Sequence, residues 1–188
     1  MEKELTSKES LELITQMIGK AKRRAAGDGS FQMLLWGWAV ALCNLGHYVL
    51  AKIDYPAPYI VWLALIPVVG VSIWFSVTKS KKTGVKTHLD AVLSQLWLMV
   101  FLGILMVLAF MPQLNFYQNP VILILAGIGV FTTGAMIQVN LVKYGGIILF
   151  IAALIAFFLP ITEQYLVAGI AIMIGYLVPG YSLKKNKS

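Results

Sequence analysis

Five stretches of this chain contain no Asp, Glu, Lys or Arg, and each is long enough to cross a membrane. They are residues 29–51, 55–78, 91–142, 144–162 and 164–183. A charge at the centre of a bilayer costs about 2.5 to 3.5 kcal/mol even on permissive scales, and a spanning helix needs roughly 17 to 25 residues. Hydrophobic residues make up 59% of the chain and charged residues only 12%. This composition excludes both a water-soluble globule and a disordered chain.

The third stretch is too long for one helix, and a polar segment divides it. Residues 112–120 begin and end with proline and contain Gln and Asn, which is typical of a turn. The runs on either side are apolar on every face, which favours helices over the alternating strands of a β-barrel. We therefore predict an all-α membrane protein, whose bundle over residues 30–183 has six transmembrane helices near 31–51, 57–78, 91–111, 120–140, 144–160 and 164–182.

The positions of the basic residues predict the orientation of this bundle. Of the fifteen Lys and Arg residues, only Lys52 falls on one side of the predicted topology, and the other fourteen fall on the opposite side. By the positive-inside rule, both termini are cytoplasmic, including a basic tail over residues 184–188. The net charge of +7 follows from this topology, so we expect no nucleic-acid partner.

Residues 1–29 are predicted to form a cytoplasmic amphipathic helix followed by a joint. Thr6 and Glu9 fit a capping box at its start. Gly27-Asp28-Gly29 is expected to end the helix and to provide a flexible connection to the first span. The apolar residues project within roughly 160° of a helical wheel, and they are Leu11, Leu13, Ile14, Met17, Ile18, Ala21 and Ala25.

Two interpretations of this helix compete. In one, it lies on the inner leaflet of the phospholipid bilayer or packs under the bundle, and anionic lipids contact its basic end at roughly 1 kcal/mol per base. The candidate lipid contacts are Lys20, Lys22, Arg23 and Arg24. In the other, its apolar face docks onto a cytoplasmic partner protein or a second copy of the chain, as in a homo-oligomer.

Few polar side chains fall inside the predicted spans, and four of them form a candidate intramembrane site. Asn44 and His47 stand three residues apart on the first span, so that they project about 60° from each other, while Thr132 and Thr133 lie near the middle of the fourth. A histidine there could bind a ligand or pass protons. The alternative is structural, because such a histidine often bonds to a neighbouring helix and threonines in spans usually bond to backbone.

Proline and glycine residues mark places where the spans bend or pack closely. Pro67 falls halfway along the predicted second span with Gly70 after it, which predicts a kink that is either a hinge or a feature of bundle shape. Small residues in the spans predict close helix contacts. They include Gly127 and Gly129 in the fourth span, and two pairs four residues apart, Gly37 and Ala41 in the first and Ala171 and Gly175 in the sixth.

The sequence contains no spacing typical of a catalytic or metal site. HExxH, GxSxG, CxxC and Walker-A patterns are all missing, and Cys43 is the one cysteine. We expect no catalytic residue, cofactor or metal, and a protein that is not an enzyme.

Three segments resemble a known family. ESLELITQMIGKAK over 9–22, LLWGW over 34–38 and GYLVPGY over 175–181 are similar to a family of uncharacterised bacterial multi-span inner-membrane proteins. The resemblance covers the whole chain and implies a bacterial inner membrane location, but it implies no activity or ligand.

Two functional hypotheses follow. The first is a non-enzymatic regulatory or scaffold protein that engages lipid or a partner through residues 6–26. The alternative is a small channel or carrier with a weakly polar site between the first, second and fourth helices, using Asn44, His47, Pro67, Thr132 and Thr133.

Overall fold

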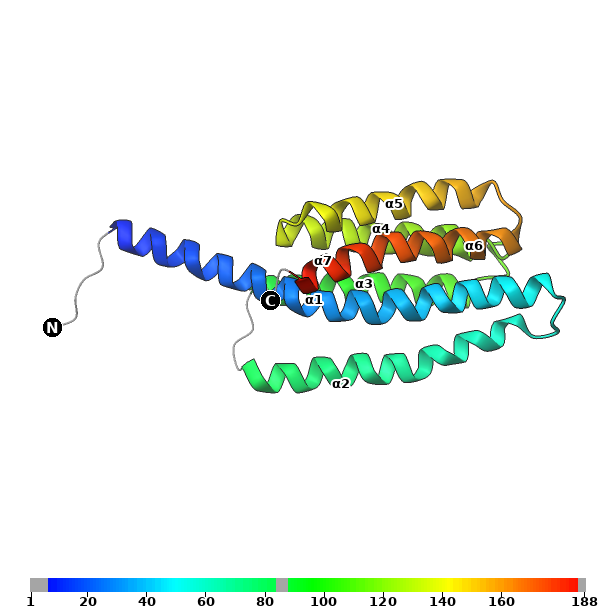
Figure 1. Ribbon diagram of the computed structural model, residues 1–188, viewed down its shortest axis with the longest axis horizontal. Helices are drawn as coiled ribbons and strands as arrows, with labels where there is room; N and C mark the ends of the chain where they lie inside the picture. The colour runs from blue at the N-terminus through cyan, green and yellow to red at the C-terminus, as the bar shows by residue number, and fades with distance from the viewer. Residues whose placement is uncertain (1–6, 84–87, 186–188) are drawn as a thin grey trace.

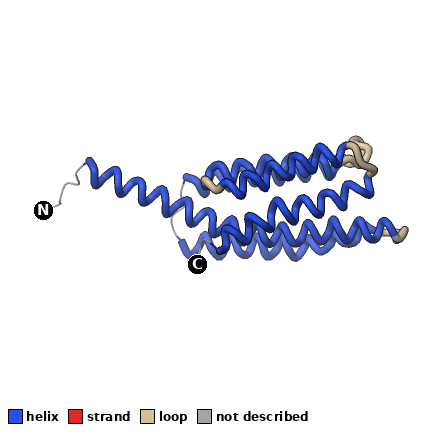
Figure 2. The backbone as a smooth tube through the Cα atoms, turned by 45° about the horizontal axis from the view of Figure 1, so that its top comes forward, coloured by secondary structure: helices blue, strands red, loops and turns tan. Residues whose placement is uncertain are grey.

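The computed structural model describes residues 7–83 and 88–185, and every regular element in them is helical (Figures 1 and 2). The all-α prediction is confirmed, and six helices are long and apolar enough to cross a membrane. In chain order the elements are α1 (Ser7–Lys52), the 3-10 helix η1 (Pro58–Ala64), α2 (Leu65–Thr83), α3 (His88–Ala109), α4 (Gln118–Ile137), α5 (Asn140–Phe157), α6 (Ile161–Ile172), the π-helix η2 (Met173–Leu177) and α7 (Val178–Lys185).

The helices lie side by side, and α1 extends well beyond the rest (Figure 1). We call the end of the bundle that carries the turns 53–57, 110–117 and 158–160 the distal end. The opposite, proximal end carries the α4–α5 turn at 138–139 and the end of α7. Lys143 and Lys184 lie at the proximal end and Lys52 at the distal end, which agrees with the predicted separation of basic residues.

The bundle packs through glycine and other small residues. On α5, a Cβ placed on Gly146 would lie 2.7 Å from the Phe131 backbone nitrogen and 2.8 Å from the Gly127 carbonyl oxygen on α4. On α1, a Cβ on Gly37 would lie 2.7 Å from the Leu177 side chain. The predicted packing role of Gly37 and Gly127 is therefore confirmed.

In contrast, α2 lies at the periphery, where within the described chain it packs against α1 and continues from η1 (Figure 1). Polar contacts attach it to α1 near the proximal end, because the Ser72 hydroxyl donates to Gln32 Oε1 at 2.9 Å. The rings of Phe31 and Phe75 stack beside this bond, with 4.0 Å between centroids.

The predicted joint at Gly27-Asp28-Gly29 is wrong, because α1 is one helix of 46 residues that runs through it. Each glycine costs a helix about 1 kcal/mol relative to alanine, but contacts on both sides of the joint hold the helix. Ala25 is buried in the core cluster that also contains Leu183, and the Ser30 hydroxyl donates to the Gly180 carbonyl at 3.0 Å. The helix therefore has no break at the predicted boundary between residues 29 and 30. Thr6, which was predicted to cap the helix, lies outside the described residues.

The second span also differs from its prediction. Residues 58–64 form a 3-10 helix, and Pro67 is the third residue of α2 instead of the midpoint of one uniform helix. Proline is tolerated in a first turn, where its missing N–H would have no helical partner. The expected mid-helix kink is thus replaced by a change of helix type just before Pro67.

The other span boundaries shift by a few residues. The span predicted at 120–140 is α4 and ends at Ile137, because Gln138 adopts a left-handed conformation with φ of 60°. The span predicted at 164–182 begins at Ile161 and includes η2, which comes just before Pro179, a residue that cannot donate a backbone hydrogen bond. The first two residues of the predicted tail, Lys184 and Lys185, belong to α7.

The glycine contacts lead to a first prediction. Gly146→Ala should lower the free energy of unfolding by about 1 to 3 kcal/mol, because the new methyl group meets backbone atoms that cannot move aside. Gly70→Ala is the control, since a Cβ at this exposed position meets nothing within 4 Å. Thermal unfolding of the purified protein in detergent measures both, and equal melting temperatures would contradict the packing role of Gly146.

Candidate polar site at the distal end

Four elements meet near the distal end through a chain of aromatic and polar side chains. The Trp62 indole in η1 donates to Nδ1 of His47 on α1 at 3.1 Å. The His47 ring stacks on Tyr165 of α6, with 3.8 Å between centroids. The Tyr165 hydroxyl in turn accepts from Nε2 of Gln118 on α4 at 2.9 Å. Because Nδ1 of His47 accepts a hydrogen bond, it carries no proton.

Four buried side-chain atoms near this series of contacts lack a hydrogen-bond partner. Among the described residues, no other buried side-chain nitrogen or oxygen lacks one. The four atoms are Asn44 Oδ1, Gln118 Oε1, Asn119 Nδ2 and Gln164 Oε1. All four residues are at most 6% exposed. We name the distal polar cluster as these four residues together with His47, Trp62 and Tyr165. An unpaired buried polar group costs about 1 to 3 kcal/mol.

Local sequence explains why these amides are buried at helix ends. Gln118 and Asn119 begin α4 directly before Pro120, which suits a first turn because it needs no N–H partner. Pro160 stands at the N-cap of α6, and Gln164 follows within its first turn. Neither helix has a side-chain cap, so both present free N–H groups at this end.

An ion pair lies at the rim of the cluster. Lys52 at the end of α1 contacts Glu163 of α6, and its ammonium also lies 5.5 Å from the centre of the Tyr48 ring. The pair neutralises its own charges beside Gln164. The members of the cluster are therefore neutral hydrogen-bonding groups.

The structure divides the four residues that the sequence singled out. Asn44 and His47 belong to the distal polar cluster, although the Asn44 amide nitrogen donates to Val40 within its own helix at 2.8 Å. Thr133 instead donates to the Gly129 carbonyl at 2.7 Å and accepts from Trp97 of α3 at 3.1 Å. This is the structural role considered for threonines. Thr132 is half-buried on α4.

The remaining candidates lie away from the cluster. Pro67 and Gly70 are exposed on α2. Lys20 and Arg23 are exposed on α1 and Lys22 is half-buried, whereas the side chain of Arg24 is outside the described part of the structure. No contact tests a lipid role for these bases, so this stays a prediction.

Sequence reasoning missed Gln118, Asn119, Gln164 and Tyr165. The first two fell in a segment interpreted only as a turn, and the last two in a region interpreted as a span end. The signal in the sequence was the presence of uncharged amides, two of them adjacent, directly after the turns that precede the fourth and sixth spans. Which helices those ends would meet required the tertiary structure.

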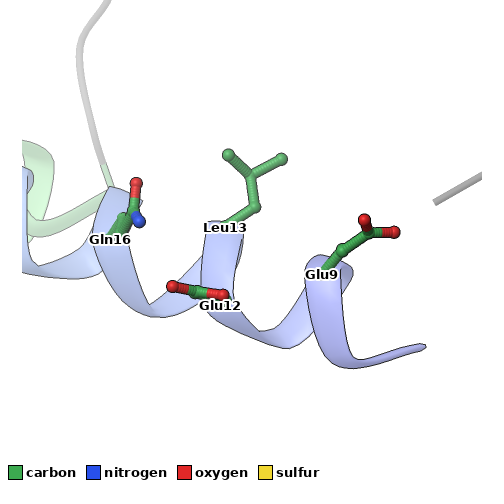
Figure 3. Close-up of a pocket in the computed structure, with 4 residues that line it drawn as sticks. All are labelled: Glu9, Glu12, Leu13 and Gln16. Carbon is green, nitrogen blue, oxygen red and sulfur yellow. The ribbon is translucent and has the colours of Figure 1, made fainter. Parts of the chain in front are cut away.

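Two shallow hollows are lined by residues outside the distal polar cluster. Glu9, Glu12, Leu13 and Gln16 line the first, and Figure 3 shows that all four project from one stretch of helix. The second, of about 320 Å³, lies between α1 and the η1–α2 segment and is lined by Ala39, Leu42, Cys43, Val61, Ala64 and Val68. No group of three potential metal ligands occurs among the described residues.

The contact between Tyr165 and Gln118 supplies a second prediction. Tyr165→Phe should lower the free energy of unfolding by about 1 to 3 kcal/mol, because it leaves the buried Gln118 amide nitrogen without an acceptor. Tyr181→Phe is the matched control, since the Tyr181 hydroxyl accepts from Trp38 at an exposed site and should change stability by less than about 0.5 kcal/mol. Thermal unfolding of both variants tests this, and similar small losses would show that the buried bond contributes little.

Comparison with known proteins identifies no similar protein. No family model, curated protein or solved structure matches the chain. The role of the distal polar cluster and of the extended α1 must therefore be argued from their geometry.

Proposed function

We propose that this chain is a multi-pass protein of a bacterial inner membrane, with both termini in the cytoplasm. Six apolar helices of sufficient length support membrane insertion. Lysines at the proximal end, such as Lys143 and Lys184, support a cytoplasmic location of that end. The bacterial origin rests on the resemblance of the three sequence segments described above.

Within this membrane we infer a non-enzymatic scaffold or regulatory protein that acts through the free part of α1. The observation that carries this proposal is the continuity of α1 from the bundle to Ser7 (Figure 1). At about 1.5 Å per residue, the helix reaches roughly 27 Å beyond Ala25, the first of its residues in the core. We call residues 7–20 the arm.

The arm presents an apolar surface that the rest of the described chain does not cover. Leu11, Ile14, Met17 and Ile18 are each more than half exposed. A helix continuous with a membrane span rises away from the bilayer, so it cannot also lie flat on lipid without bending. This geometry favours docking onto protein over adsorption to the inner leaflet.

A second copy of the arm is the occupant that fits this surface. Residues 11, 14, 18 and 21 are apolar and follow alternating steps of three and four, which is the spacing of a coiled-coil seam. In this register Glu9, Glu12, Lys20 and Arg23 fall at outer positions, and Lys22 and Arg24 flank the seam. Two copies in one membrane also have the same orientation, which lowers the entropic cost of parallel pairing.

A small channel or carrier is the second candidate function. The distal polar cluster favours it, because unpaired amides beneath the bundle end could contact a passing solute. Of the four residues predicted for such a site, however, only His47 bonds to a side chain near the distal end, while Asn44 bonds within α1 and Thr133 bonds within α4 and to α3. These contacts do not connect the distal end of the bundle to its proximal end.

The proposed pairing of arms gives a third prediction. In a Cys43→Ser background, Ile14→Cys should form an intermolecular disulfide in membranes under oxidation, because position 14 lies in the seam. Gln16→Cys is the control on the outer face, and it should cross-link at least several-fold less. The measurement is the dimer fraction on non-reducing gels.

Two other outcomes would show that the arm contacts something other than a second copy of the chain. If Ile14→Cys forms a cross-link to a different protein, the partner is a heterologous helix. If an environment-sensitive dye attached to the thiol of the Ile14→Cys variant reports lipid contact and neither position cross-links, the arm lies on the inner leaflet and the scaffold proposal fails.

The topology gives a fourth prediction. In intact cells that express the chain without Cys43, a membrane-impermeant thiol reagent should label Asp54→Cys but should label Lys184→Cys only after permeabilisation. Asp54 lies in the distal turn and Lys184 at the proximal end of α7. The opposite labelling pattern would invert the proposed orientation.

A further inference from the structure

We propose that His47 and Trp62 form a proton-sensitive latch, which holds η1 against α1 at neutral pH and releases η1 in acid. Their bond is the one hydrogen bond between side chains that joins η1 to α1 within the described residues. The inference concerns the distal end of the bundle. It does not depend on the scaffold function proposed for the arm.

The bond between the two rings and the protonation of the imidazole exclude each other. The indole N–H of Trp62 can only donate, and it donates to Nδ1 of His47 at 3.1 Å. Nδ1 therefore holds a lone pair, and the one proton of the neutral ring is on Nε2. A second proton can add only at Nδ1. It removes the acceptor and sets two N–H donors against each other, so acid breaks this bond.

The contact of His47 with α6 survives the same protonation. The imidazole ring stacks on Tyr165, with 3.8 Å between centroids and 15° between the ring planes. A cation that lies over the face of an aromatic ring is attracted to it. Acid therefore weakens the contact of α1 with η1 and preserves the contact of α1 with α6, so that η1 is the element that moves.

Few other contacts hold η1 in place. None of its residues is fully buried, and it follows the exposed distal turn at 53–57. The Val61 carbonyl accepts from the Cys43 thiol at 3.3 Å, which is a weak donor, and the Val61 side chain lies beside Gly46. At the proximal end, Ser72 bonds α2 to α1. One end of the η1–α2 segment can thus move while the other stays attached.

The charges around His47 make it the group that responds near neutral pH. The titratable groups near it are Cys43, Tyr48 and Lys52 on α1, Tyr59 on η1, and Glu163 and Tyr165 on α6. Thiols, phenols and ammonium groups ordinarily titrate well above pH 7, whereas an imidazole does so near pH 6.5. Lys52 and Glu163 contact each other, and a variant separates the carboxylate from the imidazole.

Release of η1 would change the hollow between α1 and the η1–α2 segment. Cys43 and Val61 both line this hollow, and Val61 is the residue directly before Trp62. Movement of η1 takes one wall of the hollow away from the other. The latch therefore gives the fold two states that differ in the width of this hollow.

The first measurement follows the indole N–H of Trp62 by nuclear magnetic resonance. The full-length protein in nanodiscs is titrated from about pH 8 to about pH 5, the range around the ordinary histidine pKa. Trp62→Phe identifies the signal among the five tryptophans. The signal should shift upfield in acid as the bond is lost. His47→Gln should abolish this change, because an amide oxygen accepts without titrating.

His88→Gln is the matched control, since His88 is the other histidine of the chain and lies at the start of α3. It should keep the acid response of the Trp62 signal. Glu163→Gln should also keep the response, because the pair with Lys52 is separate from the latch.

The second measurement tests whether η1 leaves α1. Spin labels are placed at Ile60→Cys on η1 and Phe158→Cys in a distal turn, both exposed positions, in a Cys43→Ser background. Double electron–electron resonance should show one distance at neutral pH and a second one in acid. Val49→Cys paired with Phe158→Cys is the control, because position 49 is on α1, and this pair should keep one distance at both pH values.

Each outcome decides the proposal. An indole shift and a second distance that His47→Gln removes, and that both control variants keep, support the latch. A Trp62 signal that does not change, or that changes equally in His47→Gln, overturns it. An indole shift without a second distance also overturns it, because η1 then stays in place after the bond is lost.

A second variant keeps the test decisive if His47→Gln does not fold. Trp62→Phe cannot donate to the imidazole, so the latch should be open already at neutral pH. The second distance should then be present at both pH values. If Trp62→Phe instead shows only the wild-type distance at neutral pH, the bond does not hold η1 and the proposal fails.

Discussion

Close packing of helices at glycine is the interaction on which the rest of this structure depends. Gly127 and Gly146 bring α4 against α5, Gly37 brings α1 against η2, and Gly169 brings α6 against α1. In lipid, burying apolar side chains does not drive helices together, so close van der Waals contact and interhelical hydrogen bonds must do so. The position of every other side chain follows from these contacts.

Helix α2 has few such glycine contacts, and side-chain interactions attach it to the bundle instead. On α2, a Cβ at Gly70 would meet nothing within 4 Å, and the helix is attached to α1 by Gln32, Ser72 and stacked rings instead. Polar and aromatic bonds of this kind are individually modest. The bundle thus has a tightly packed part formed by α1 and α4–α7 and a peripheral part formed by α2, with α3 joined to α4 through Trp97 and Thr133.

The two candidate functional surfaces lie at opposite ends of α1, and they differ in chemistry. The arm at the proximal end is apolar and exposed, whereas the distal polar cluster is polar and buried. Because α1 is a single helix, the His47 position and the arm belong to one continuous element. An exposed apolar face suits another helix.

Much of the helical pattern was predictable because it depends on local properties. Charge-free stretches and the two prolines around residues 112–120 identified six apolar helices, and the small residues Gly127 and Gly129 indicated close contacts. Errors arose where a distant contact outweighed a local preference. Gly27 and Gly29 should weaken a helix, but Ser30 bonds to Gly180 and Ala25 joins the core, so α1 continues.

The residues alone determined that this chain forms apolar helices, where their turns fall and which end carries the basic side chains, because composition and periodicity act over neighbouring residues. Only the tertiary structure decided which polar groups meet. Gln118 and Tyr165 are 47 residues apart and bond because two helix ends converge, while Thr133 is turned to α3 and away from the predicted site. Such pairings depend on how whole helices pack, and a single sequence does not encode that in any local pattern.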